Sequence, residues 1–210
     1  DLMTPFKGVT KDNNLRADTT LEKLASLKLA FDRSSGHGTL SAGNSTPLSD
    51  GASAALLGSE NWARQRGLPV QAWLTHAQTA AVDFVHGAGL LMAPTVAVAR
   101  MLKQAGLSLQ DFDYYEIHEA FAAQVLCTLR AWESADYCKK ELGLDRALGA
   151  IDPAKLNVNG SSLALGHPFA ATGARLVATL AKLLEQKVSG RGLISICTAV
   201  GMGVTAILER

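Results

Sequence analysis

From Val70 to the carboxyl terminus, short β-compatible segments alternate with helical segments, and this alternation restricts the fold more than any other feature of the sequence. Leu68-Pro69 precedes the first strand-like segment, and glycines end several of the later segments. Such alternation is typical of a mostly parallel sheet that helices cover. We predict an α/β fold with a mixed, mostly parallel sheet of five strands, of which the last two pair as a hairpin. The predicted strands are 71–77, 113–117, 156–158, 192–197 and 204–208, and the predicted helices are 94–104, 119–132 and 169–186.

The first 68 residues show a less regular pattern. Asp18 or a following threonine can cap a short helix that ends near Phe31. Two β-compatible runs, 39–42 and 52–57, flank a long turn rich in Asn, Ser, Pro, Asp and Gly. A helix is expected over 61–67, and Leu68-Pro69 after it marks the predicted domain boundary.

Composition excludes several classes of protein. The chain has 210 residues, a formal net charge of +1 and 48% apolar residues, without blocks of like charge. These values fit a globular protein and argue against nucleic-acid binding, and no apolar run approaches the ~20 residues of a membrane span. Cys127, Cys138 and Cys197 show no CxxC spacing, so we expect neither a disulfide framework nor a metal site, and we expect a reducing compartment.

A histidine stands at the turn before the helix predicted over 169–186. His167 lies between Gly166 and Pro168 and is followed by the small residues of FAATGA. The positive end of a helix favours the neutral imidazole, which can accept a proton. The alternative is a partly exposed histidine that only fills the turn.

Two further reactive side chains fall at predicted strand ends. His118 follows the strand 113–117, and Cys197 ends the strand 192–197 before a glycine-rich turn. Open α/β sheets bind ligands at the carboxyl edge of their strands, so His118, His167 and Cys197 are expected to converge there. The alternatives are a capping histidine and a buried cysteine that packs as a small apolar residue. HEAFA is not a zinc-protease motif, because Ala122 stands where the second histidine is required.

Three segments resemble the signature blocks of the thiolases, in the same order and near the carboxyl terminus: HEAFAAQ, NVNGSSLALGHPFAATGAR and CTAVGMG. The HEAF form resembles the branch that includes the β-subunits of the trifunctional complexes of fatty-acid oxidation, and FDRSSGHGTLSAGNSTPLSDGASA is similar to the end of the family's first half. Thiolases consist of two similar halves and a loop domain. The resemblance implies that residues 1–34 end the loop domain, 35–68 form the last strands and helix of the first half, and 69–210 form the complete second half.

The resemblance also implies a reaction, the cleavage of a 3-ketoacyl-CoA by CoA through an acyl-cysteine. His167 would activate the nucleophilic cysteine and help stabilise the thioester oxyanion, and Cys197 would transfer the remaining protons. His118, in place of the family's asparagine, would orient the water that completes the first oxyanion hole, and the Ala199 N–H would donate in the second. These roles fit the reaction, because a carbanion beside a thioester needs a polarised carbonyl and an acid of suitable pKa.

The resemblance assigns substrate contacts as well. Phe31 and Phe121 would line the pantetheine channel, Ser45 or Thr46 would contact the pantetheine amides, and Arg16 would lie near the adenine. CoA would be a substrate, and no resident cofactor is expected. The implied assembly is a homodimer, with a hydratase/dehydrogenase subunit as a further partner, in the cytoplasm of a bacterium or in a mitochondrion.

The sequence departs from the family pattern in two ways. No cysteine matches the nucleophile of the first half, because Cys127 and Cys138 follow the GTLSAGN segment instead of preceding it. We therefore expect the chain to be inactive without the missing amino-terminal half. Ala199 and Val200 replace glycines of many relatives and narrow the turn. A biosynthetic acetoacetyl-CoA thiolase, a non-catalytic lipid carrier of the same fold and a purely structural piece stay open, whereas a ketoacyl synthase would need a histidine at Cys197.

Overall fold

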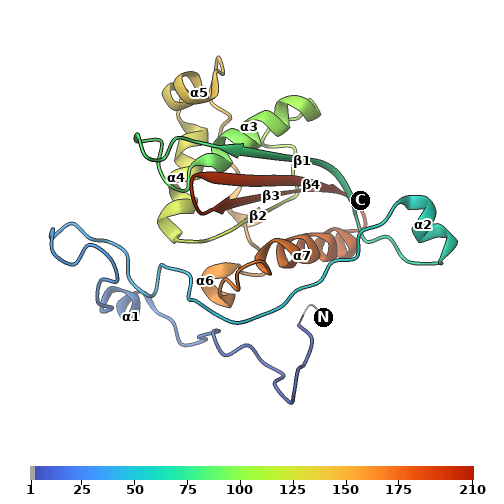
Figure 1. Ribbon diagram of the computed structural model, residues 1–210, viewed down its shortest axis with the longest axis horizontal. Coiled ribbons are helices and arrows are strands. Elements are labelled where there is room, and N and C mark those ends of the chain that lie inside the picture. The colour runs from blue at the N-terminus through green and yellow to red at the C-terminus, as the bar shows by residue number, and fades with distance from the viewer. Residues whose placement is uncertain (1–2) are drawn as a thin grey trace.

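The computed structural model describes residues 3–210, and these form a four-stranded sheet between two helical layers, with a long irregular segment at the amino-terminal end (Figure 1). α3, α4 and α5 lie on one side of the sheet, and α6 and α7 lie on the other. None of the helices in residues 3–210 is long and apolar enough to cross a membrane. The elements are α1 (Leu21–Ala25), α2 (Glu60–Gln65), β1 (Trp73–Ala81), α3 (Ala93–Ala105), β2 (Tyr114–Ile117), α4 (Ala122–Glu133), α5 (Ala135–Leu142), the 3₁₀ turn Pro153–Lys155, α6 (Ser162–Leu165), α7 (Thr172–Lys187), β3 (Arg191–Thr198) and β4 (Met202–Glu209).

The sheet has the strand order β1-β4-β3-β2. β3 and β4 form the predicted antiparallel hairpin, and β1 pairs antiparallel with β4. β2 pairs with β3 in parallel, with Ile117 opposite Ser195. The predicted α/β class is confirmed. The prediction of a mostly parallel sheet of five strands is wrong, because the described strands number four and one of their three pairings is parallel.

The predicted strand 156–158 is reduced to a single bridge by Asn157. Leu156 forms a parallel bridge to Tyr115, but Asn157 has a left-handed φ of 45°, which ends the extended conformation. The buried Asn157 side chain then takes the place of a neighbouring strand's backbone, because it pairs with both backbone groups of Ile117. The Ile117 N–H donates to Asn157 Oδ1 at 2.8 Å, and Asn157 Nδ2 donates to the Ile117 carbonyl at 2.9 Å.

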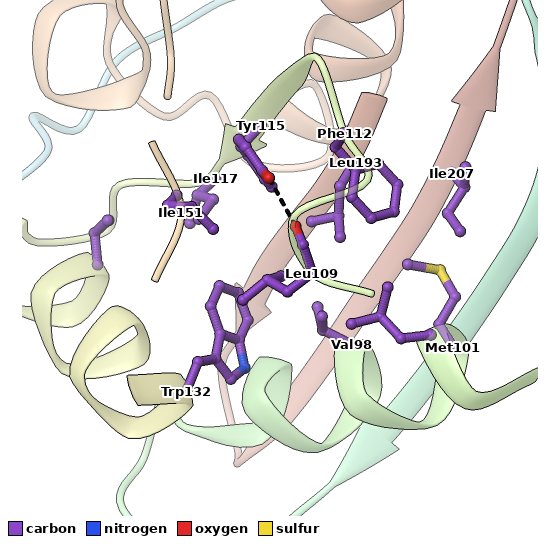
Figure 2. Packing of buried hydrophobic residues seen from close by; sticks show 12 residues of the cluster. Val98, Met101, Leu109, Phe112, Tyr115, Ile117, Trp132, Ile151, Leu193 and Ile207 are labelled. Carbon is purple, nitrogen blue, oxygen red and sulfur yellow. Dashed lines mark hydrogen bonds between the residues drawn. The ribbon is translucent and has the colours of Figure 1, made fainter. Parts of the chain in front are cut away.

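Each face of the sheet carries its own apolar cluster. The cluster under α3 and α4 includes Met101, Phe112, Tyr115 and Trp132, all within 1% exposure, and Figure 2 shows them packed around Leu109. The buried Tyr115 hydroxyl keeps a hydrogen bond, because it donates to the Leu109 carbonyl at 2.7 Å. The second cluster joins α7 to the opposite face through Leu176, Leu180, Ala181, Leu184, Ile194 and Leu208.

The amino-terminal segment differs most from the sequence-based expectations. The runs 39–42 and 52–57 form no strands. The first run is limited to an isolated antiparallel bridge between Ser41 and Leu29, and no strand within residues 3–210 pairs with the second. The helix expected over 18–31 shortens to α1, which Thr20 caps by accepting from the Lys23 N–H. The last predicted helix begins at Thr172, because Ala170 adopts a left-handed φ of 67°. The helices α5 and α6 were not predicted.

We predict that Asn157→Ala destabilises the chain. The change leaves the Ile117 N–H and carbonyl buried without partners and puts an alanine at a left-handed position. The expected loss in the free energy of unfolding is about 2–4 kcal/mol. Urea unfolding followed by circular dichroism measures it, with Asn159→Ala as a matched control, because Asn159 is exposed. Equal stability of both variants would contradict the role of the Asn157 amide.

Candidate active site

His118 and Cys197 meet at the edge of the sheet where the parallel strands β2 and β3 end. The backbone N–H of His118 donates to the Ser195 carbonyl at 2.9 Å, so the first residue after β2 is tied to β3. His118 is 2% exposed and Cys197 is 6% exposed. Both line one small cavity that is too narrow to hold a water molecule, and its other lining residues are Pro94, Ile117, Gln124, Thr128 and Ser195.

His167 approaches His118 from the connection between α6 and α7. The centroids of the two imidazole rings are 4.3 Å apart, and the rings are inclined by 43°. His167 Nδ1 lies 2.6 Å from Thr172 Oγ1, and the His167 N–H donates to the Pro47 carbonyl at 3.3 Å. His167 lines a more open cavity of about 460 Å³, with Leu48, Ser49, Asp50, Gly51, Pro168 and Phe169.

The three side chains therefore form a row. His118 contacts His167 on one side and shares a cavity with Cys197 on the other. His167 and Cys197 line different cavities in this structure, and His118 adjoins both residues. Of the three residues expected to converge, His118 is thus the one that adjoins both others.

Burial sets the protonation of the row. Burial, together with the nearby His167 and Arg175, lowers the pKa of His118 to about 3. Burial and Arg175 also lower the pKa of His167. Burial raises the pKa of the Cys197 thiol to about 11, although the backbone N–H groups of Cys197 and Ala120 oppose the shift. At neutral pH the row therefore holds two neutral imidazoles, which can accept or donate a proton, and one thiol, which can donate.

A polar network behind His118 was not foreseen from the sequence. Ser162 Oγ lies 2.8 Å from His118 Nδ1, and Arg175 Nη2 donates to the same oxygen at 2.8 Å. Glu119 accepts from Asn157 Nδ2 at 2.8 Å and from the Leu163 N–H at 3.0 Å. These residues lie inside the quoted blocks, but a serine or an arginine in a helix carries no signal of a partner distant in sequence.

Glu116 adds a buried acid close to this network. It is 0% exposed, and neither carboxylate oxygen has a hydrogen-bond partner within residues 3–210. Burial raises the pKa of Glu116 to about 8, although the charge of Arg175 opposes the shift. Burial likewise lowers the pKa of Arg175, against the attraction of Glu116 and Glu119. The sequence offered no reason to single out Glu116.

The residues assigned to substrate contacts fall in two places. Phe31 and Phe121 stack edge to face with centroids 5.7 Å apart, and Ser45 forms an antiparallel bridge to Phe121. Thr46 joins this group, since its N–H donates to the Ala120 carbonyl at 3.0 Å and its hydroxyl donates to the Ser162 carbonyl at 2.8 Å. Arg16 is exposed, and its only described hydrogen bonds are those its carbonyl accepts from Thr19.

The turn after Cys197 lies at the surface. Ala199 and Val200 are exposed, and Val200 has a left-handed φ of 61°. Gly201 packs so closely against Val82 that an added Cβ would lie 2.6 Å from the Val82 carbonyl oxygen. This contact holds the turn beside the end of β1. Within residues 3–210, His, Cys, Asp and Glu side chains form no group of three or more that could hold a metal ion.

Two family models match the chain. The thiolase carboxyl-terminal domain matches residues 68–210, and the thiolase amino-terminal domain matches residues 3–61. A 3-ketoacyl-CoA thiolase of Shewanella loihica is 44% identical over 206 residues, which cover 98% of this chain and 46% of the relative. The chain thus spans about half the length of the curated relatives it matches.

Solved structures of similar enzymes also superpose on the chain. An acetyl-CoA acetyltransferase of Bacillus anthracis superposes with a TM-score of 0.77 at 38% identity, over 95% of this chain and 45% of that one. Human mitochondrial 3-ketoacyl-CoA thiolase superposes with a TM-score of 0.74 at 30% identity, over 94% of this chain and 44% of that one. A structure of the human protein in complex with CoA also matches, with a TM-score of 0.73.

We predict that Cys197 resists alkylation in the folded chain. A thiol with a pKa of about 11 is ionised in about one molecule in a thousand at about pH 8, and Cys197 is also buried. Iodoacetamide should therefore modify the exposed Cys127 at least about 100 times faster than Cys197. Peptide mapping by mass spectrometry measures both rates, and the urea-unfolded chain is the control. Equal rates in the folded chain would contradict this environment.

We also predict that His118 makes the chain sensitive to acid. Its pKa is about 3 in the folded chain against 6.5 ordinarily, so below about pH 6.5 the unfolded chain binds a proton that the folded chain excludes. Stability therefore falls as the pH falls, by up to about 1.4 kcal/mol for each pH unit. Between about pH 7 and about pH 4.5, His118→Asn should lose about 2 kcal/mol less than the wild type. Urea unfolding at both pH values measures this loss.

The exposed His37 supplies the control for this experiment. His37→Asn should retain the pH dependence of the wild type. A His118→Asn variant that loses as much stability on acidification as the wild type would contradict the burial of a neutral imidazole.

Proposed function

Because this chain belongs to the thiolase family, we propose that it supplies the acid and base groups of an enzyme that cleaves a 3-ketoacyl-CoA with CoA. The products would be acetyl-CoA and an acyl-CoA shortened by two carbons. The observation that carries the proposal is the row formed by His167, His118 and Cys197 at one edge of the sheet. The names and the 44% identity of the Shewanella relatives support the substrate class.

His167 is the base of the proposed reaction. Its Nδ1–H can donate to Thr172 Oγ1, whose own hydroxyl faces the Pro168 carbonyl at 3.5 Å, and this leaves Nε2 with a free lone pair. Nε2 would take the proton of a nucleophilic cysteine supplied by the rest of the full-length protein. The thiolate would attack the keto carbon, and the bond between the α- and β-carbons would break to give an acyl-cysteine and the carbanion of acetyl-CoA.

Cys197 is the acid of the proposed reaction. Its raised pKa keeps the thiol protonated until the carbanion forms and accepts that proton. The resulting thiolate would then take the proton of an incoming CoA, whose sulfur attacks the acyl-cysteine. The shortened acyl-CoA is released, and the expelled cysteine thiolate regains its proton from His167. His118, which adjoins both residues, would stabilise the thioester enolate.

The group formed by Phe31, Phe121, Ser45 and Thr46 is the proposed site for the pantetheine arm. Phe31 is 51% exposed although it stacks on Phe121, so an apolar surface is open to a ligand beside the backbone that precedes α4. Thr46 connects this group to Ser162, which contacts His118. A ligand bound along Phe121 would thus lie close to the reactive row. We propose CoA as a substrate here and no resident cofactor.

Condensation of two acetyl-CoA molecules is the second candidate activity. It is favoured by the 38% identity to the Bacillus anthracis acetyl-CoA acetyltransferase. Comparison of acetoacetyl-CoA with longer 3-ketoacyl-CoA substrates in one assay separates the two, because a thiolase of fatty-acid degradation should retain activity on the longer chains.

We predict that the full-length protein loses about 10²- to 10⁴-fold in kcat for thiolysis on His167→Ala or Cys197→Ala, since each change removes a general acid or base. The assay follows the CoA-dependent loss of absorbance of a magnesium-bound 3-ketoacyl-CoA enolate. Cys127→Ser is the control and should retain activity, because Cys127 is exposed on α4 outside the row. Full activity of the Cys197→Ala variant would remove the proposed proton transfers.

A further inference from the structure

We propose that Ser162 and Arg175 are positioning residues that hold His118 in the neutral tautomer with its proton on Nε2. The catalytic consequence of this tautomer rests on the proposed function, but the tautomer itself follows from the hydrogen bonds of this chain. His118 would then present a fixed N–H donor to the substrate.

The inference begins at Arg175, which can only donate hydrogen bonds. Its Nη2 donates to Ser162 Oγ at 2.8 Å, so this oxygen is an acceptor in that contact. The serine is 0% exposed, and among residues 3–210 its hydroxyl has one other hydrogen-bond partner, His118 Nδ1 at 2.8 Å. The hydroxyl proton is therefore directed to Nδ1, because the alternative leaves a buried O–H without an acceptor.

The protonation of His118 follows from that direction. Nδ1 accepts from Ser162, so the proton of the neutral ring is on Nε2. Within residues 3–210, Nε2 of His118 has no hydrogen-bond partner of its own. The ring borders both the Cys197 cavity and the ring of His167. Its free N–H would thus reach an oxygen of a thioester beside Cys197 when this cavity, too narrow for a water molecule in the structure, widens to admit the substrate.

The surrounding chain keeps Ser162 and His118 in register. Glu119, directly after His118, accepts from the Leu163 N–H, directly after Ser162. Asn157 holds the other oxygen of Glu119 and the backbone of Ile117, directly before His118. Both partners of the 2.8 Å contact are therefore flanked by hydrogen bonds between the same two segments. Such a frame fixes the orientation of the ring as well as its tautomer.

His167 differs in this respect, although its Nδ1 also faces a hydroxyl. The Thr172 hydroxyl has a second acceptor, the Pro168 carbonyl at 3.5 Å, and none of the described side chains donates to Thr172 Oγ1 in the way that Arg175 donates to Ser162. His167 can therefore carry its proton on Nδ1 and present a bare Nε2. Two adjacent histidines would thus present opposite hydrogen-bonding groups, a donor on His118 and an acceptor on His167.

The test is histidine NMR on the 210-residue chain labelled with ¹⁵N, in which long-range ¹H–¹⁵N correlations report which ring nitrogen carries the proton. His118→Asn assigns the signals of His118. We expect the Nε2–H pattern in the wild type, a shift to Nδ1–H or to a mixture in Ser162→Ala, and the wild-type pattern in Ser162→Thr, which keeps the hydroxyl. Arg175→Met should produce a mixture as well, because the hydroxyl is then free to accept from Nδ1. An Nδ1–H pattern in the wild type, or an unchanged pattern in Ser162→Ala, would overturn the proposal.

Kinetics of the full-length protein test the consequence separately. Ser162→Ala should lower kcat for thiolysis by about 10- to 100-fold with little change in KM, and Ser162→Thr should restore most of it. A wild-type protein without thiolase activity but with the expected NMR patterns would refute the proposed function and leave the tautomer assignment standing. An unchanged kcat in Ser162→Ala, with a shifted NMR pattern, would overturn the catalytic part of the inference.

Discussion

The parallel pairing of β2 with β3 is the interaction on which the candidate site depends. Parallel strands end at the same edge of a sheet, so the residues that follow β2 and end β3 must lie side by side. The bond from the His118 N–H to the Ser195 carbonyl extends that ladder by one residue beyond β2. An antiparallel pairing would have sent His118 and Cys197 to opposite ends of the molecule.

A second constraint fastens the histidine-bearing loop to the same edge. A further strand beside β2 would supply backbone hydrogen-bond partners to the N–H and carbonyl of Ile117. Asn157 supplies both partners with its side chain instead, so the backbone can turn away at this residue. The turn leads into α6, which carries Ser162, and then to His167. The loss of a regular fifth strand is thus what brings a helix start and a second imidazole against the end of β2.

Burial gives this site its chemical character. Burial penalises charge, so at neutral pH His118 and the half-buried His167 are neutral and Cys197 keeps its proton. The same environment makes each hydrogen bond strong and each unpaired polar group costly. The described part of the chain meets that demand at His118 Nδ1 and at Glu119. The Glu116 carboxylate, Arg175 Nε and Ser195 Oγ lack hydrogen-bond partners there, and Glu116 is held mostly protonated at neutral pH.

The sequence by itself determined the α/β class, the helix that Gly106 ends, the β3–β4 hairpin and the positions of His118 and Cys197 at strand ends. These features depend on local periodicity, turn residues and short motifs, which involve only residues that are close in the sequence. It also predicted strands at 39–42, 52–57 and 156–158 that did not form. Ser41 and Leu156 each form only an isolated bridge, and the left-handed Asn157 ends the extended conformation after Leu156. Tertiary structure alone decided that His118 adjoins both His167 and Cys197, and that Ser162, Arg175 and Asn157 hold it there. Hydrogen bonds between segments about 40 residues apart leave no periodic pattern in the sequence.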